Sequence, residues 1–513
     1  MKHAALGDMS TIVARLRETY ADDRAALEVL DACERRLREP LRIGIAGMVK
    51  AGKSTLLNAL IGERIAPTDA GECTRTVTWY RHGPTARVTV HLRDGSTERM
   101  PVRRSQGHLA LDLGDLRADE VEWIDVEWPS ESLRSIVLID TPGIASLSAD
   151  VSARTISFLT PSRAPSAADA IIYLLRHVHA SDVKFLEEFH DTAAGASQTV
   201  NALAVLSRAD EIGSGRIDSL LSAAKIAERY RRDGELRSLA LGVIPVAGLL
   251  AEGARTLRQS EFAAFQTLAG LDRALRTRAL ISVDRFLGGT AEIPLSVAQR
   301  RDLLARFGVF GVRLATALVR AGARTSTELA ERLVQQSGLI EVQNFVTEQF
   351  RARASSLKTR GVAHTLETLV RERRRPDAAG LLPEIERLAL GTHDLRELAL
   401  LADLRTGTPD LSADDILEAE RIVGGAGTST VERLGLTEGA DRRAVRERID
   451  QLLTRWRGIA ESPLSERATI EICRTVTRSV EGVASELPTR RAAAAAAAVA
   501  DVVTTGGPAQ RRR

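Results

Sequence analysis

The chain has 513 residues, of which 44% are hydrophobic, 27% charged and only 4% aromatic. This length allows two or more domains with ample buried core, and the composition is that of an ordinary soluble protein. The formal net charge of +3 is too small for a strong overall attraction to nucleic acid, so we expect no nucleic-acid partner.

The cysteines and the first residues predict a cytoplasmic protein. The three cysteines are scattered and show no metal-ligand spacing, which is typical of reduced thiols. The opening MKHAALGDMS lacks the apolar core of an export signal, and no uninterrupted apolar run reaches the length of a membrane span. We therefore expect membrane contact to be peripheral, at the inner face of the cell membrane.

The N-terminal segment predicts one long amphipathic helix. Apolar side chains recur at helical spacing over residues 10–39, and Pro40 ends the run. No neighbour in an α/β domain would obviously cover this apolar stripe, so we expect residues 1–39 to pack on the helical bundle of the C-terminal region.

From residue 40 to 252 the pattern changes to short apolar runs separated by helical segments. Such alternation predicts an α/β domain with a mainly parallel, doubly wound sheet. Asp94-Gly95 predicts a hairpin turn between the runs 86–93 and 97–102, so an antiparallel insertion is expected early in this domain. The expected strands are 41–46, 76–82, 86–93, 121–127, 135–140, 170–175, 202–206 and 241–246.

Beyond about residue 255 strand signals vanish and helical spacing dominates. Apolar residues recur every three or four positions over 303–318, 339–350 and 395–401. These segments predict a long helical bundle, a neck and stalk, over 253–489. The tail 490–513 is alanine-rich, ends in three arginines and is expected to be disordered.

A phosphate loop is predicted by the run GMVKAGKS, residues 47–54, which fits G-x-x-x-x-G-K-[ST] between a strand-like run and an apolar-periodic helix. Its glycines let backbone N–H groups approach an anion at a helix start. We expect Lys53 to reach the β- and γ-phosphates and the Ser54 hydroxyl to ligate Mg²⁺. The nucleotide-binding residues expected here are Gly47, Lys50, Ala51, Gly52, Lys53, Ser54 and Thr55.

Two further segments predict the γ-phosphate and Mg²⁺ contacts. The run DTPG, residues 140–143, follows an apolar run, so Asp140 can hold Mg²⁺ through water and the Gly143 N–H can meet the γ-phosphate. Between the two motifs, the Thr-rich stretch 67–78 suits a switch segment. We expect Thr74 to complete the Mg²⁺ coordination when the γ-phosphate is present, with Thr68 and Thr76 as competitors.

The segment SRAD, residues 207–210, predicts recognition of guanine. The Asp210 carboxylate can accept hydrogen bonds from guanine N1–H and the guanine amino group, which adenine cannot offer. The usual pattern is Asn/Thr-Lys-x-Asp, from which Ser207 and Arg208 depart, although Arg208 can lie over the base as a cation–π partner. The alternative is a solvated loop carboxylate. Ala247 and Gly248, after the last expected strand, suit the backbone that contacts the guanine carbonyl.

The residue that assists hydrolysis is less evident. Small GTPases often place a glutamine after the DTPG glycine to orient the attacking water, and Ile144 cannot do so. Lys50 is a candidate because its charge can offset charge on the transferring phosphoryl group; the alternative is a solvated lysine that points away. The expected catalytic residues are therefore Lys53, Ser54, Thr74 and Lys50, and activity is expected to require self-association.

The segments AGMVKAGKSTLLNALIGERIAPTDAGECTRTVTW, DTPG and SRADEIGSGRID resemble bacterial dynamin-like proteins, and are most similar to the isoniazid-inducible (Ini) group of mycobacteria and relatives. The resemblance is close over 40–250 and continues less specifically through RFGVFGVRL and SGLIEVQNFVTEQF. It implies a large GTPase of low affinity that dimerises through its nucleotide face and remodels membranes. Related guanylate-binding and atlastin-type GTPases carry an arginine finger at the position of Lys50, whereas dynamins proper have a serine there that acts with a monovalent cation.

Two segments are candidates for membrane contact. Phe307 and Phe310 can insert beside anionic headgroups, or Gly308 and Gly311 can instead permit close helix packing inside the bundle. A basic patch is the second candidate, with ordinary solvated surface as the alternative. Its residues are Arg371, Arg373, Arg374 and Arg375.

The sequence therefore predicts a GTPase that uses GTP and Mg²⁺ and couples hydrolysis to self-association and to work on an anionic membrane surface. The expected partners are GTP and GDP, a second copy of the chain or a paralogous dynamin-like protein, and the membrane. The alternatives are a regulatory GTPase or GTP-gated scaffold whose helical domain binds proteins, and an ATPase in which Asp210 does not read the base.

Overall fold

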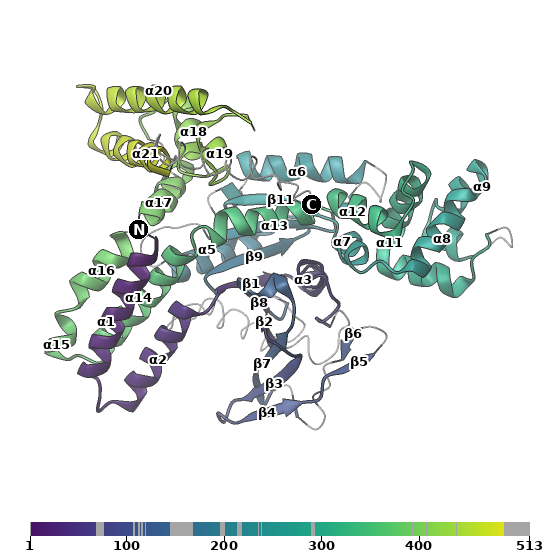
Figure 1. Ribbon diagram of the computed structural model, residues 1–513, viewed down its shortest axis with the longest axis horizontal. Coiled ribbons are helices and arrows are strands. Elements are labelled where there is room, and N and C mark those ends of the chain that lie inside the picture. The colour runs from purple at the N-terminus through teal and green to yellow at the C-terminus, as the bar shows by residue number, and fades with distance from the viewer. Residues whose placement is uncertain are drawn as a thin grey trace, which may run out of the picture. The chain divides into compact units, whose positions relative to one another are not determined.

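The computed structural model describes residues 2–67, 76–105, 108–110, 113, 116–117, 119–143, 168–194, 201–212, 218–233, 235–237, 239–288, 293–391, 393–406, 409–437 and 439–486. They belong to two compact units, Met1–Arg405 and Thr406–Arg513 (Figure 1). The predictions for Thr68, Thr74, Ile144 and the tail 490–513 lie outside the described residues. The expected domain limits at residues 39, 252 and 489 stay a prediction.

The first unit is built on a nine-stranded sheet in the order β11-β10-β9-β1-β8-β2-β7-β3-β4 (Figure 1). Its centre from β11 to β8 is parallel, while β2 runs antiparallel to β8, and β3 and β4 extend the sheet as an antiparallel pair. This confirms the α/β class with a mainly parallel sheet. A short β5–β6 pair was not predicted. The strands are β1 Leu41–Gly47, β2 Val77–His82, β3 Arg87–Leu92, β4 Thr97–Met100, β5 Arg103–Ser105, β6 His108–Ala110, β7 Val121–Trp128, β8 Ile136–Asp140, β9 Ala170–Leu175, β10 Ala202–Ser207 and β11 Gly242–Val246.

The predicted hairpin joins β3 to β4. Gly95 adopts φ 86°, a conformation that glycine reaches without strain. The Asp94 carboxylate accepts hydrogen bonds from the Ser96 backbone N–H (2.8 Å) and hydroxyl (2.6 Å), which fixes the turn. The two strands then pair from Val88 with Met100 to His91 with Thr97, so this prediction is confirmed.

Helices cover the sheet on both faces, which explains why β9 and β10 are buried along their whole length. On one face, α5 (Ala180–Ala194) and α6 (Ser219–Asp233) pack with Ala46, Ile139 and Tyr173 into one core. Because side chains alternate along a strand, the buried neighbours Ile45 and Leu138 point to the other face. There α3 (Lys53–Ile61) contacts β1 and β8, and its N-terminus receives the phosphate loop.

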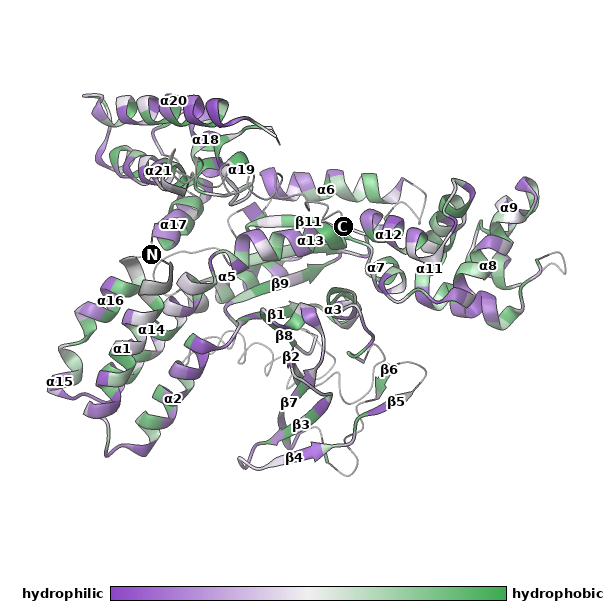
Figure 2. Cartoon of the chain, in the orientation of Figure 1, coloured by the Kyte–Doolittle hydropathy of each residue, from purple (hydrophilic) through white to green (hydrophobic). Residues whose placement is uncertain are grey.

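The N-terminal segment forms two helices, so the prediction of one helix over 10–39 was wrong. Helix α1 (Lys2–Thr19) ends before Asp23, which caps α2 (Arg24–Arg38) by accepting from the Ala26 backbone N–H at 3.1 Å. Both helices carry hydrophilic and hydrophobic residues (Figure 2). Their apolar side chains, including Leu16 and Leu30, pack with Leu366 of α14 (Ala354–Glu372) and with α16 (Leu382–Gly391).

Beyond β11 every described element is helical. Helix α11 contains a kink at Gly308, where φ is 63° and ψ is 175°, and a π-helix (Val346–Arg351) links α13 to α14. No described helix is both long and apolar enough to cross a bilayer. The remaining helices of the first unit are α7 Gly248–Arg255, α8 Gln259–Gly270, α9 Arg273–Ala279, α10 Val283–Leu287, α11 Val297–Arg320, α12 Ser326–Gln336, α13 Leu339–Phe345, α15 Pro376–Ala379 and α17 His393–Thr406.

The second unit is a small helical group whose main contact is between α20 and α21. Trp456 of α20 is fully buried, and its indole N–H donates to a carboxylate oxygen of Glu418 on α18 at 3.2 Å. The same carboxyl group also accepts from Arg448 at 2.8 Å. The helices are α18 Ala413–Ile422, α19 Thr430–Leu434, α20 Arg442–Glu461 and α21 Arg467–Glu486.

Candidate nucleotide site

The phosphate loop leaves the end of β1 and enters α3 through backbone conformations that favour glycine. Gly47 has φ 144°, and a Cβ atom there would lie only 2.3 Å from the carbonyl oxygen of Leu174 on β9. Gly52 has φ 95° and occupies the N-cap position of α3. These two glycines therefore give the loop its close approach to β9 and its turn into the helix, as the motif requires.

Lys53 folds back over the loop that it follows. Its ammonium group donates to the carbonyl oxygens of Gly47 and Met48, at 3.2 Å each. Burial lowers the pKa of Lys53, and the nearby Asp140 carboxylate opposes part of that shift. A half-buried cation held by two carbonyl groups gains from an arriving phosphate, because an anion compensates its charge better than neutral dipoles do.

Asp140 ends β8 directly beside Ser54. One carboxylate oxygen accepts from the Ser54 hydroxyl at 2.8 Å, whereas the other, Oδ1, is buried without a hydrogen-bond partner. Burial raises the pKa of Asp140, with Lys53 as the main opposing charge. A hydroxyl next to an unsatisfied carboxylate oxygen fits the ligand preference of Mg²⁺, which takes oxygen ligands directly or through water. These two residues would hold the ion, which would supply charge compensation to bound phosphates.

The DTPG segment lies directly against the phosphate loop. A Cβ atom on Gly143 would come within 2.8 Å of the Val49 Cα, so only glycine permits this approach. Thr141 anchors the segment by donating its hydroxyl to the Ile45 carbonyl oxygen at 2.9 Å. Of the switch candidates, Thr76 is buried with an unpartnered hydroxyl, while Thr74 lies outside the described residues.

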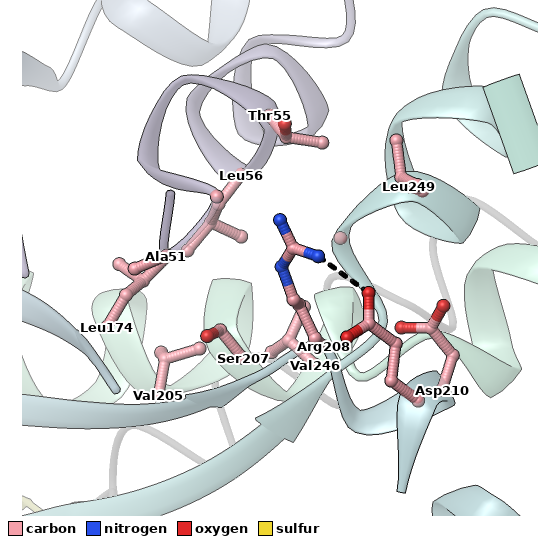
Figure 3. A pocket seen from close by; sticks show the side chains of 13 residues that line it. Ala51, Thr55, Leu56, Leu174, Val205, Ser207, Arg208, Asp210, Val246 and Leu249 are labelled. Atoms are coloured by element: carbon pink, nitrogen blue, oxygen red, sulfur yellow. Dashed lines mark hydrogen bonds and ion pairs between the residues drawn. The ribbon is translucent and has the colours of Figure 1, made fainter. Parts of the chain in front are cut away.

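A pocket of about 550 Å³, partly open to solvent, lies between α3, the end of β10 and the start of α7 (Figure 3). Asp210 lines it with 9% of its surface exposed, and burial raises the pKa of its carboxyl group. The remaining lining residues are Ala51, Gly52, Thr55, Leu56, Leu174, Val205, Ser207, Arg208, Glu211, Val246, Gly248 and Leu249.

Ser207 and Arg208, the residues that depart from the usual Asn/Thr-Lys-x-Asp pattern, each make specific contacts. Ser207 donates its hydroxyl to the Leu175 carbonyl oxygen at 3.1 Å, which ties the ends of β10 and β9 together. Arg208 projects across the pocket toward α3 (Figure 3). It donates to the carbonyl oxygen of Lys50 at 3.1 Å and pairs with Glu211 at 2.7 Å. The sequence had not pointed to Glu211, although it directly follows the SRAD segment.

The two backbone candidates after β11 differ. The Ala247 N–H donates to the Ser337 carbonyl oxygen at 2.9 Å, so it is already engaged by the α12–α13 connection. Gly248 begins α7 and lines the pocket. The N–H groups of a first helical turn have no partner within their helix, so Gly248 is the better placed of the two to meet a ligand oxygen.

The structure contradicts one membrane candidate. Phe307 and Phe310 are 0% and 3% exposed and belong to the core that α7, α8 and α11 share, so neither presents its ring to a lipid surface. The glycine interpretation holds for Gly311, where a Cβ atom would lie 3.3 Å from the Leu250 side chain of α7. Gly308 serves instead as the kink of α11.

Most of the basic patch is engaged within the first unit. Arg373 pairs with Asp23 at 2.5 Å, and Arg375 pairs with Asp22 at 2.6 Å and lies over the Tyr20 ring at 4.9 Å. These contacts join the end of α14 to the α1–α2 turn. Arg374 between them is exposed and stays a candidate for an anionic surface.

The sheet order, the glycine-dependent phosphate loop and the Ser54–Asp140 pair together define a P-loop nucleotide-binding protein. Comparison with known proteins narrows this class. The model of the dynamin family matches residues 43–194. The isoniazid-induced protein IniC of Mycobacterium tuberculosis is 42% identical over 462 residues, which cover 90% of this chain and 93% of that protein.

Two more distant likenesses accompany these. A bacterial dynamin-like protein of Nostoc punctiforme is 34% identical over 114 residues, or 20% of this chain and 16% of that protein. A solved structure of an oligomerised bacterial dynamin pair, described as a mechanism for long-range sensing and tethering of membranes, covers 94% of this chain at 14% identity. Its TM-score of 0.31, over 78% of that chain, is too low to support an argument. On the identity to IniC and the family match, the chain belongs to the dynamin family.

Proposed function

We propose that this protein binds and hydrolyses GTP at the site between α3, β8, β10 and α7. The proposal rests on two groups of residues that lie close together, one suited to phosphates and one suited to a base. Lys53, Ser54 and Asp140 meet at the phosphate loop, and the buried Asp210 carboxylate lines a pocket whose wall includes Ala51 and Gly52 of that loop. The family match over residues 43–194 supports the assignment.

Asp210 is proposed to select guanine. A buried carboxylate with little solvent contact gains from two N–H donors, and guanine offers both at one edge. The test is competition of GTP, ATP and XTP against a fluorescent GDP analogue. Asp210→Asn should weaken GTP binding by about a hundredfold and improve XTP binding, because xanthine presents a carbonyl group in place of the amino group. Equal binding of ATP and GTP to the natural chain would instead support the ATPase alternative.

Mg²⁺ is proposed to bind through the Ser54 hydroxyl and, through water, Asp140. When bound, the ion supplies charge compensation to the β- and γ-phosphates. Ser54→Ala removes the hydroxyl and leaves the loop glycines in place. This variant should lose most of its GTP turnover, with a far smaller loss in nucleotide affinity measured in EDTA, where no ion contributes.

Lys50 is proposed to assist hydrolysis in a pair of molecules. It is exposed at the rim of the phosphate loop, where a second nucleotide face can meet it. GTP turnover per molecule should rise with protein concentration, and Lys50→Ala should flatten that rise while GTP affinity stays within about threefold. Turnover independent of concentration would argue for a chain that works alone or beside a paralogue.

Membership of the dynamin family favours a further step, in which GTP-driven self-association acts on an anionic membrane surface. Arg374 is the remaining candidate of the basic patch. Sedimentation with phosphatidylserine vesicles, with and without GTP, tests this step, and Arg374→Glu should weaken binding. Absence of any vesicle binding or of vesicle-stimulated turnover would favour a regulatory GTPase or scaffold that binds proteins through its helices.

A further inference from the structure

The phosphate loop, residues 47–54, and the segment 207–211, here called the base loop, meet at two positions of unusual backbone conformation. Among the described residues, the non-glycine residues with positive φ are Lys50, at 62°, and Arg208, at 52°. Such conformations are unfavourable for residues with a Cβ atom and persist where surrounding contacts hold them. Arg208 lines the pocket and Lys50 belongs to the phosphate loop, and a hydrogen bond joins them directly, from the Arg208 guanidinium to the Lys50 carbonyl oxygen at 3.1 Å.

A carboxylate holds the arginine that makes this bond. Glu211 accepts from Arg208 at 2.7 Å through one oxygen and from Arg176 at 2.5 Å through the other. Arg176 directly follows β9, and Glu211 ends the 3₁₀ turn η3 (Ala209–Glu211). Figure 3 shows Arg208 reaching across the pocket, with the dashed line marking its ion pair. One carboxylate therefore links β9, the base loop and, through Arg208, the phosphate loop.

The left-handed backbone at Arg208 begins the turn that carries the Asp210 and Glu211 carboxylates. In this turn, η3, the Glu211 N–H donates to the Arg208 carbonyl oxygen at 2.9 Å, and both Asp210 and Glu211 line the pocket. A guanidinium needs such orientation more than an ammonium group does, because it is planar and forms hydrogen bonds only along fixed directions. Without the negative charge of Glu211, the two arginines repel each other and Arg208 loses the partner that aims it at Lys50.

We propose that Glu211 is a positioning residue for nucleotide binding, which aims Arg208 at the Lys50 carbonyl and so stabilises the phosphate loop in its left-handed turn. This inference rests on the proposed GTP site. In this chain, Arg176, Glu211 and Arg208 would together do what the Asn/Thr and Lys of the usual Asn/Thr-Lys-x-Asp pattern do. The conformation of the phosphate loop would then depend on contacts with the base loop.

The test compares Glu211→Gln with the natural chain in steady-state GTP hydrolysis and in GDP release. The variant should raise KM for GTP and the GDP release rate about threefold to tenfold, with kcat at saturating GTP changed less than twofold. The effect is modest because the Arg208 and Glu211 side chains are 39% and 47% exposed, and it should shrink at 0.5 M salt. Glu228→Gln is the matched control, since Glu228 also pairs with two arginines, Arg231 and Arg232, but does not line the pocket.

Second variants separate positioning from general stability. In an Arg208→Lys background, Glu211→Gln should have less than a twofold effect on KM, because an ammonium group needs no such orientation. In a Lys50→Gly background its effect should also shrink, since glycine adopts φ 62° unaided, whereas in Lys50→Ala the effect should persist. An unchanged KM in Glu211→Gln, an equal loss in Glu228→Gln, or a fall in kcat alone would each overturn the inference. Failure of the natural chain to bind GTP would overturn the proposed function instead.

Discussion

The ion pair between Arg36 and Asp169 joins the N-terminal helices to the sheet, and its removal should destabilise the first unit. The Asp169 side chain is 0% exposed and that of Arg36 is 9% exposed. One carboxylate oxygen accepts from the Arg36 guanidinium at 2.7 and 3.1 Å, and the other accepts from the Arg42 backbone N–H at 2.9 Å. Breaking a buried pair of this kind by removing one partner costs about 3–5 kcal/mol.

Arg36→Met should lie at the lower end of that range, about 3 kcal/mol, because Asp169 keeps the Arg42 N–H and the nearby charge of Lys358. Adding Asp169→Leu should recover part of the loss, since it removes the uncompensated charge. The double variant then retains a penalty of about 1–2 kcal/mol for the unpaired Arg42 N–H. The signature of a buried ion pair is therefore a double variant that is more stable than either single variant.

The rate of thiol labelling measures the loss of stability at α2 itself. Cys33 lies on α2, burial raises its pKa to about 11, and it should label only when α2 detaches. A loss of about 3 kcal/mol should speed its labelling about a hundredfold, while Cys473 in the second unit, also buried, provides an internal reference. Arg38→Met, on an exposed turn of the same helix, should change the rate less than about threefold. Equal labelling of Cys33 in Arg36→Met and the natural chain, or a double variant less stable than both single variants, would show that the ion pair does not hold α2 in place.

Three further variants or conditions test the site. Burial raises the pKa of Asp210, and GDP binding needs the ionised carboxylate. GDP affinity should therefore be full above that raised pKa and fall as the pH drops through it. In the same titration, Asp210→Asn should show only the weaker pH dependence of the phosphates. Gly308→Ala should lower the free energy of unfolding by about 1–3 kcal/mol through backbone strain alone, because its Cβ atom would keep an ordinary 3.8 Å from the Asp210 carboxylate; a urea titration with no change would contradict this. Gly47→Ala should abolish nucleotide binding in calorimetry, since the new Cβ atom would overlap the Leu174 carbonyl oxygen; retained binding would show that β9 can yield.

The sheet was predictable because its strands are unbroken apolar runs. The runs at 170–175 and 202–206 match β9 and β10 to within a residue, and both strands are buried on two faces, so no polar alternation obscures them. The phosphate loop was predictable for another reason: its glycines are required by positive φ and by the close approach to β9, and such requirements leave a sequence pattern.

The errors have equally specific causes. Helical periodicity continues across Asp22 and Asp23, and this spacing outweighed the preference of an aspartate such as Asp23 for the start of a helix. The apolar character of Phe307 and Phe310 fits a lipid surface and a protein core equally, and only the packing of α7, α8 and α11 distinguishes them. Glu211 was missed because its proposed role depends on the left-handed backbone at Arg208. Positive φ is not expected at an arginine, so the sequence pattern does not indicate it.

Strand β1 runs from the α2 junction to the phosphate loop. At its start, the Arg42 N–H donates to Asp169, which holds Arg36 of α2; at its end, Gly47 opens the phosphate loop. Its seven residues span roughly 20 Å, and hydrogen bonds to β8 and β9 on both sides make the strand stiff. The α2 junction and the phosphate loop therefore lie at the two ends of one stiff strand. Since α2 packs on α14, β1 links the candidate nucleotide site to this group of helices.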